Sequence, residues 1–199
     1  RKSSAYVCLA IATIAHTVTT SCFSQDKTDQ SSQPQISIIS KTVHKTGEIA
    51  FTVRSPWQKS DTTVHVLVPD NSDGSEKLRV LFVLPVEPGS GTRWGSALDQ
   101  IIKRDLHNKH HLICVYPTFS ELPWFADHPS DKTLRQESYL VEGIVPFIDA
   151  NFKTTAKPSD RLLVGFSKSG WGAFTLLLRN PNVFGKARES GRASWRERV

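Results

Sequence analysis

The chain has 199 residues, of which 38% are hydrophobic, and a formal net charge of +6. This length is sufficient for one domain with a sizeable core. The charge is concentrated at the two ends, since Arg1 and Lys2 supply +2, and five basic against two acidic residues between 186 and 199 supply +3. Only +1 remains for everything between, so the sequence has no basic surface of the kind that binds nucleic acid, and we expect no nucleic-acid partner.

The first 24 residues are typical of a secretory signal peptide. A basic pair precedes an apolar region from Ala5 to Val18, and small residues follow up to Ser24. The apolar region is too short and too interrupted for a stable membrane span. Cleavage after Ser24 predicts a secreted or periplasmic protein, while Cys22 leaves a lipid anchor open as an alternative. Residues 25–47 open with a polar stretch rich in Ser, Gln and Asp and are expected to form a flexible spacer.

Residues 48–187 carry the pattern of a folded domain. Two β-rich segments come first and are expected to pair antiparallel at a sheet edge, which places His65 at the edge or surface. Buried strands, an amphipathic helix and a mainly helical segment with a kink at Pro146 then alternate along the chain. The expected elements are strands at 49–54, 63–68, 78–86, 112–116 and 162–164, and helices around 98–106, within 133–152 and from 171 onward. This alternation predicts an α/β fold with a mostly parallel sheet covered on both faces.

The sequence Gly-Phe-Ser-Lys-Ser-Gly at residues 165–170 lies between the last apolar strand and the last helix. It is a close variant of the G-x-S-x-G nucleophile elbow, with Ser in place of the final Gly. So abrupt a turn requires small residues two positions before and after its centre, and Gly165 and Ser169 meet that requirement. Ser167 is therefore the candidate nucleophile. The alternative is a Gly/Ser turn that binds phosphate, although the spacing matches neither a Walker loop nor a dinucleotide loop.

Ligands of parallel sheets bind outside the carboxyl ends of the strands, where the loops at 87–95 and 117–129 are expected to meet Ser167. Candidate substrate contacts on these loops are Trp94, Trp124, Asp127 and His128. Trp94, Trp124 and Phe125 could form an acyl or aromatic pocket, or could equally be packing residues. Asp127 and His128 precede Ser167, which makes them poor triad candidates.

Other reactive side chains favour simpler interpretations. His107, His110 and His111 have metal-ligand spacing, but a solvated helix end is the favoured interpretation, so we predict no metal and no cofactor. Cys114 is the one cysteine outside the leader and is expected to be a buried hydrophobe, so we predict no disulfide.

These features resemble the esterase branch of the α/β-hydrolase family that includes esterase D-like and feruloyl-esterase-like proteins. The best-matching stretches are 81–86, 144–152 and 165–173. The resemblance implies a three-layer α/β-hydrolase-like sandwich with leading antiparallel strands, in which Ser167 attacks an ester carbonyl, a histidine takes its proton and an acid orients the histidine. It also implies an oxyanion hole built from the backbone amides of Lys168 and of Val86 or Glu87. The implied substrate is a small-molecule or carbohydrate-linked ester.

The sequence departs from this family after the proposed elbow. No histidine follows Ser167, and the only later acids are Glu189 and Glu197. Residues 188–199 contain no apolar run where the family pattern continues with another strand. We therefore expect these residues to be an unstructured, foreign or out-of-frame tail, a genuine basic tail being the alternative, and the domain to be incomplete at its C-terminus. Such a fragment lacks the triad acid and histidine, and the rival hypothesis is a non-catalytic hydrolase-like binding domain.

Overall fold

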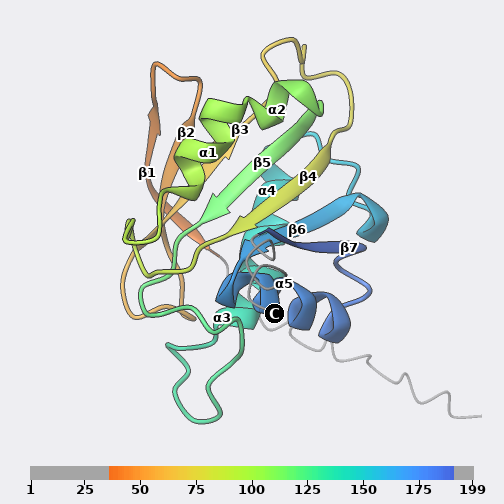
Figure 1. Ribbon diagram of the computed structural model, residues 1–199. Coiled ribbons are helices and arrows are strands. Elements are labelled where there is room, and N and C mark those ends of the chain that lie inside the picture. Colours follow the sequence, from red (N-terminus) through yellow and green to blue (C-terminus); the bar gives the residue numbers. More distant parts are fainter. Residues whose placement is uncertain (1–35, 191–199) are drawn as a thin grey trace, which may run out of the picture. The chain divides into compact units, whose positions relative to one another are not determined.

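The computed structural model describes residues 36–190, whose strands form one seven-stranded sheet in the order β1-β2-β3-β5-β4-β6-β7 (Figure 1). The first strands pair antiparallel, as does β3 with β5, whereas β5, β4, β6 and β7 are mutually parallel. This arrangement confirms the mostly parallel sheet with leading antiparallel strands. The strands are β1 (Ser37–Val43), β2 (Ile49–Arg54), β3 (Thr62–Leu67), β4 (Arg79–Leu84), β5 (Leu112–Pro117), β6 (Arg161–Phe166) and β7 (Lys186–Ser190).

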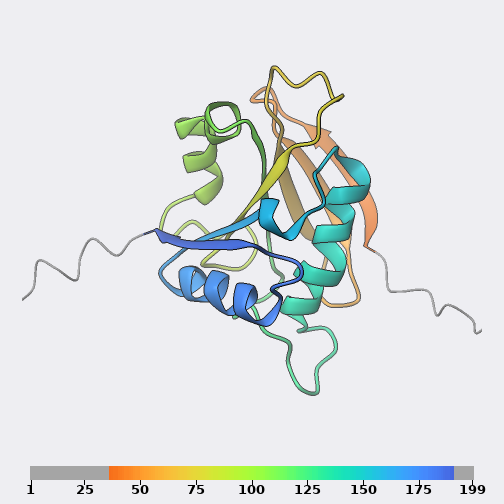
Figure 2. The same ribbon diagram turned by 90° about the vertical axis from the view of Figure 1, so that its right-hand side faces the viewer.

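Helices cover both faces of the sheet, as Figures 1 and 2 show. On one face lie α1 (Ala97–Arg104) and α2 (Leu106–Lys109). On the other lie α3 (Gln136–Ser138), a π-helical turn (Tyr139–Ile144), α4 (Val145–Asn151) and α5 (Lys168–Arg179), and a 3-10 turn (Pro158–Asp160) precedes β6. The described chain is therefore a three-layer α/β sandwich.

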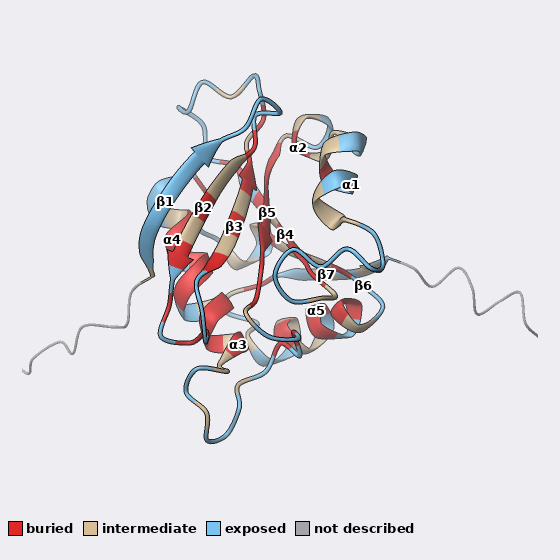
Figure 3. Cartoon of the chain, turned by 90° about the vertical axis from the view of Figure 1, so that its left-hand side faces the viewer, coloured by how far each residue is buried: buried red, intermediate tan, exposed pale blue. Residues whose placement is uncertain are grey.

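Two apolar cores lie between these layers, because successive residues of each central strand face opposite sides of the sheet. On β4, Phe82 joins the larger core beneath α4 and α5, whereas Val83 joins the smaller core beneath α1. In Figure 3 the buried segments concentrate in these central strands and in the inner faces of the helices. The continuous apolar run that predicted a buried strand thus reflects burial on both faces.

The kink expected at Pro146 falls where the helix is irregular. The helical segment begins at Gln136, passes through the π-helical turn and reaches Pro146 in the first turn of α4. Pro146 cannot donate the backbone N–H that a regular helix uses, and the π-helical turn just before it departs from regular α-helical bonding at that place.

The interpretation of 25–47 as a spacer is wrong for residues 37–43. These residues form β1, which pairs antiparallel with β2 and leaves all seven side chains exposed. Backbone pairing is the main support of this edge strand, with Lys41 also lying 5.5 Å from the centroid of the Phe51 ring, so the sequence shows no apolar alternation to reveal it. The spacer residues 25–35 and the proposed signal peptide, residues 1–24, lie outside the described residues.

The expectation of an unstructured segment from residue 188 onward is wrong for residues 188–190. They complete β7, which pairs in parallel with β6 and places Glu189 opposite Gly165. An edge strand contacts only one neighbouring strand, so it can form without a continuous apolar run. In β7 only Ala187 and Glu189 are partly buried. Residues 191–199 lie outside the described residues.

Candidate active site

Ser167 alone connects β6 to α5, so the chain turns from strand to helix within one residue. Its backbone adopts φ 52° and ψ −118°, a conformation that costs a residue with a side chain roughly 1–3 kcal/mol. The side chain is exposed at the carboxyl end of the parallel strands. The expected geometry of a nucleophile elbow is thereby confirmed.

The residues around Ser167 explain how so tight a turn is held. A Cβ atom at Gly165 would overlap the backbone carbonyl of Ser169 and the amide of Gly170, so only glycine fits there. Ser169 is completely buried, and its hydroxyl accepts the N–H of Phe166 at 2.8 Å and donates to the carbonyl of Phe166 at 3.0 Å. Ser169 therefore latches the last residue of β6 to the first turn of α5. The sequence indicated only that a small residue was needed here.

The backbone groups expected to form an oxyanion hole lie at the start of α5 and just after the end of β4. Lys168 is the first residue of α5, where an N–H has no partner within the helix and lies at the positive end of the helix dipole. Val86 and Glu87 follow β4, the parallel neighbour of β6. Their loop is fixed by two bonds: the Glu87 carboxylate accepts the N–H of Arg93 at 2.7 Å, and the carbonyl of Phe119 accepts the N–H of Gly89 at 2.8 Å.

A cavity of about 840 Å³ adjoins the elbow on the α1 side of the sheet. Val86, Glu87 and Trp94 contribute to its wall, together with Gly165 and Phe166 at the end of β6. Ser167 itself stands beside the cavity rather than in its lining. Three of the loop residues named from the sequence are thus brought together next to the candidate nucleophile.

Trp124 lies beside Lys168 rather than in the cavity. The ammonium nitrogen of Lys168 is 4.9 Å from the centroid of the Trp124 ring, and Arg93 stands in a similar position over Trp94 at 5.2 Å. Trp124 and Trp94 are 56% and 63% exposed. Neither tryptophan is a core residue, so the packing alternative does not hold for them.

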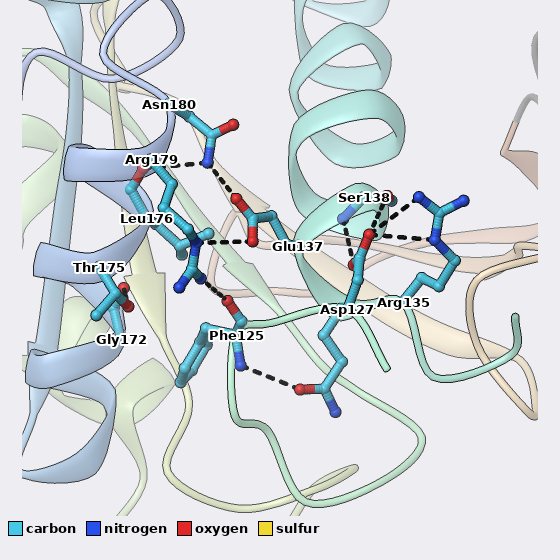
Figure 4. A network of polar contacts seen from close by, with 11 residues as sticks. Phe125, Asp127, Arg135, Glu137, Ser138, Gly172, Thr175, Leu176, Arg179 and Asn180 are labelled. Carbon is cyan, nitrogen blue, oxygen red and sulfur yellow. Dashed lines mark hydrogen bonds and ion pairs between the residues drawn. The ribbon is translucent and has the colours of Figure 1, made fainter. Parts of the chain in front are cut away.

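The loop that carries Trp124 is tied to α5, as Figure 4 shows. Arg179 of α5 donates to the carbonyl of Phe125 at 2.6 Å and pairs with Glu137 at 2.8 Å. The buried Phe125 ring occupies the space that a Cβ atom at Gly172 would need. The Gln136 side chain accepts the N–H groups of both Trp124 and Phe125, at 2.6 and 3.1 Å. Helix α5, which follows directly after Ser167, therefore also helps to position the loop that carries Trp124.

Asp127 and His128 are occupied by bonds within this loop and its base. The Asp127 carboxylate accepts the N–H and the hydroxyl of Ser138 at 2.9 and 2.5 Å and pairs with Arg135 at 3.1 Å (Figure 4). Nδ1 of His128 accepts the N–H of Asp131 at 2.9 Å. Neither residue lines the cavity beside the elbow.

The histidines singled out from the sequence and Cys114 do not line the cavity beside Ser167. His107 is buried, and His111 bonds Glu76 at 2.7 Å. Within residues 36–190 no cluster of His, Cys, Asp and Glu is suited to bind a metal ion, and no histidine lines the cavity. Burial raises the pKa of the Cys114 thiol to about 12, which keeps it protonated. None of the helices in this part of the chain has the length and apolar character to cross a membrane.

Residues 118–191 match the family described as "Putative esterase". Esterase Rv1288 of Mycobacterium tuberculosis is 31% identical over 137 residues, which cover 67% of this chain and 30% of that protein. An S-formylglutathione hydrolase from Agrobacterium tumefaciens superposes with a TM-score of 0.59 at 21% identity, covering 74% of this chain and 58% of that one. The fluorophosphonate-binding serine hydrolase FphF of Staphylococcus aureus gives a TM-score of 0.57 at 20% identity, covering 70% and 55%.

These comparisons confirm the resemblance to esterases and the α/β-hydrolase fold. The chain spans about a third of the length of the curated relatives it matches, and little more than half of the two solved structures.

Proposed function

Because the chain has the α/β-hydrolase fold and resembles esterases of that fold, we propose that it is a serine hydrolase of carboxylic esters that forms an acyl-enzyme on Ser167. The observation that carries this proposal is the strained backbone of Ser167 between β6 and α5. A glycine would adopt those angles with less strain, so a serine there indicates that its hydroxyl is needed.

The surroundings of Ser167 supply the electrostatic part of such a reaction. As the hydroxyl attacks an ester carbonyl, negative charge develops on the carbonyl oxygen. The amide of Lys168 at the start of α5 and an amide of Val86 or Glu87 are the donors proposed to stabilise that charge. The cavity next to these amides accommodates part of a small-molecule or carbohydrate-linked ester.

The proton of Ser167 requires a base, which we propose is a histidine outside residues 36–190. Two observations support this: no described histidine lines the cavity, and the chain spans only part of its relatives. On this proposal the 199-residue chain is a fragment of the catalytic domain. Losing a triad member leaves the oxyanion hole and substrate binding, which together give roughly 10³–10⁴-fold acceleration over water.

The rival proposal is a hydrolase-like binding domain without catalysis. The missing histidine favours it, whereas the strained serine favours the enzyme. For location, we propose export to the periplasm or the medium, supported by the leader-like residues 1–24 and not by the fold.

Turnover of 4-nitrophenyl acetate separates the two proposals. We expect slow hydrolysis by the 199-residue chain, and fast hydrolysis by a version extended with the native coding sequence that follows codon 190, the end of β7. Ser167→Ala should lower the rate of the extended version to the slow rate of the 199-residue chain, because removing any triad member leaves the same residual catalysis. Equal rates with and without Ser167 in the extended version would favour the binding domain.

A further inference from the structure

We propose that the ammonium group of Lys168, held against Trp124, recognises an anionic group on the ester, so that the preferred substrate carries a carboxylate near its scissile carbonyl. This inference rests on the proposed role of Ser167, because Lys168 is the next residue along the chain. The backbone amide of Lys168 is the proposed hydrogen-bond donor to the developing oxyanion. Its side chain takes no part in that bond and can bind another part of the substrate.

One side of the ammonium group faces the ring of Trp124. It stands 4.9 Å from the centroid of the Trp124 ring. The backbone that carries this ring is held in place, because Gln136 accepts the backbone N–H of Trp124 and Arg179 donates to the carbonyl of Phe125. An aromatic face attracts a cation without neutralising its charge. The opposite side of the ammonium group remains available to an anion.

Lys168 also lacks a full counter-ion. Within residues 36–190 no carboxylate lies within ion-pair distance of it. Partial burial lowers the pKa of Lys168, and the charge of Glu87 opposes this shift without forming a pair. The Glu87 carboxylate is already engaged by the N–H of Arg93. A partly desolvated cation beside a nucleophile is a suitable partner for a substrate carboxylate.

The chemistry of the proposed substrate follows from the place of Lys168 in the chain. The cation belongs to the residue next to Ser167, so we place the anion a few bonds from the carbonyl that Ser167 attacks, within the length of one lysine side chain. Half-esters of short dicarboxylic acids have this form. Monomethyl succinate is the matching probe, and methyl butyrate is its neutral counterpart of similar size.

The test is a binding titration of the ¹⁵N-labelled 199-residue chain, followed by the indole N–H signal of Trp124, which the Trp124→Phe variant identifies. Monomethyl succinate should shift this signal in a saturable manner, and methyl butyrate should not. Lys168→Met should weaken binding at least fivefold, whereas Glu87→Gln should tighten it because a repelling charge is removed. Lys157→Met, which removes an exposed lysine before β6, is the matched control and should bind like the parent chain.

Equal binding of the two esters, or unchanged succinate binding in Lys168→Met, would overturn the inference. The measurement requires no turnover. If anion binding follows the expected pattern but Ser167 carries no activity in the extended version, the recognition site stands and the proposed hydrolase function fails.

Discussion

At the scale of single residues, the strain at Ser167 gives a prediction that separates function from stability. Ser167→Gly should raise the free energy of unfolding by about 1 kcal/mol, because glycine adopts a positive φ without a Cβ clash. Ser167→Ala keeps the Cβ and should leave stability within about 0.5 kcal/mol of the parent. Urea denaturation followed by circular dichroism measures both. A glycine variant no more stable than the alanine variant would show that the turn is unstrained.

A second residue-scale prediction concerns the latch formed by Ser169. Ser169→Ala fits the same space but leaves the N–H of Phe166 without its partner, so we expect a loss of about 1–2 kcal/mol in the free energy of unfolding. Ser60→Ala, at an exposed serine, should change it by less than about 0.5 kcal/mol. If the two variants unfold at the same urea concentration, the hydrogen bonds of Ser169 contribute nothing to the free energy of unfolding.

How far the site could be predicted differs from residue to residue. Ser167 and Gly165 could be identified from the sequence, because the constraints on them are local. The turn leaves no room for a side chain at Gly165 and exposes the side chain of Ser167. The hydroxyl latch of Ser169 and the contact of Trp124 with Lys168 could not. Their partners are fixed by how β6, α5 and the Trp124 loop pack together, which no local pattern records.

At the scale of elements, α5 both begins at the candidate nucleophile and anchors the loop that carries Trp124. Arg179→Met removes the bonds to the Phe125 carbonyl and to Glu137 (Figure 4), and should cost about 1–3 kcal/mol of stability because a buried carbonyl is left unpaired. Arg104→Met is the control, since that arginine is exposed and bonds only a neighbouring glutamine. Thermal unfolding compares them. Equal melting temperatures would show that the anchor is dispensable.

The central elements could be predicted because burial on both faces leaves continuous apolar runs, as in β4, β5 and β6. The two edge strands could not. β1 exposes every side chain, and β7 is held by backbone bonds to β6 with alternate residues only partly buried. A strand that is stabilised mainly through its backbone leaves little trace in its side chains.

At the scale of the whole molecule, residues 36–190 provide the strand-to-helix turn at Ser167, the backbone amides proposed as oxyanion donors, and an adjoining cavity whose lining includes no histidine. The proposed hydrolase function therefore requires that Ser167 is a nucleophile, and that groups outside residues 36–190 are needed for full activity. An agent that reacts with activated serines, such as a fluorophosphonate probe, addresses that claim at the residue itself.

The most direct measurement is mass spectrometry after fluorophosphonate labelling of the extended version, with Ser167→Ala as its matched control. We predict that the extended version carries one adduct, on the peptide that contains Ser167, and that the 199-residue chain is labelled more slowly. The Ser167→Ala variant should carry no adduct. Equal labelling of the extended version with and without Ser167 would contradict it.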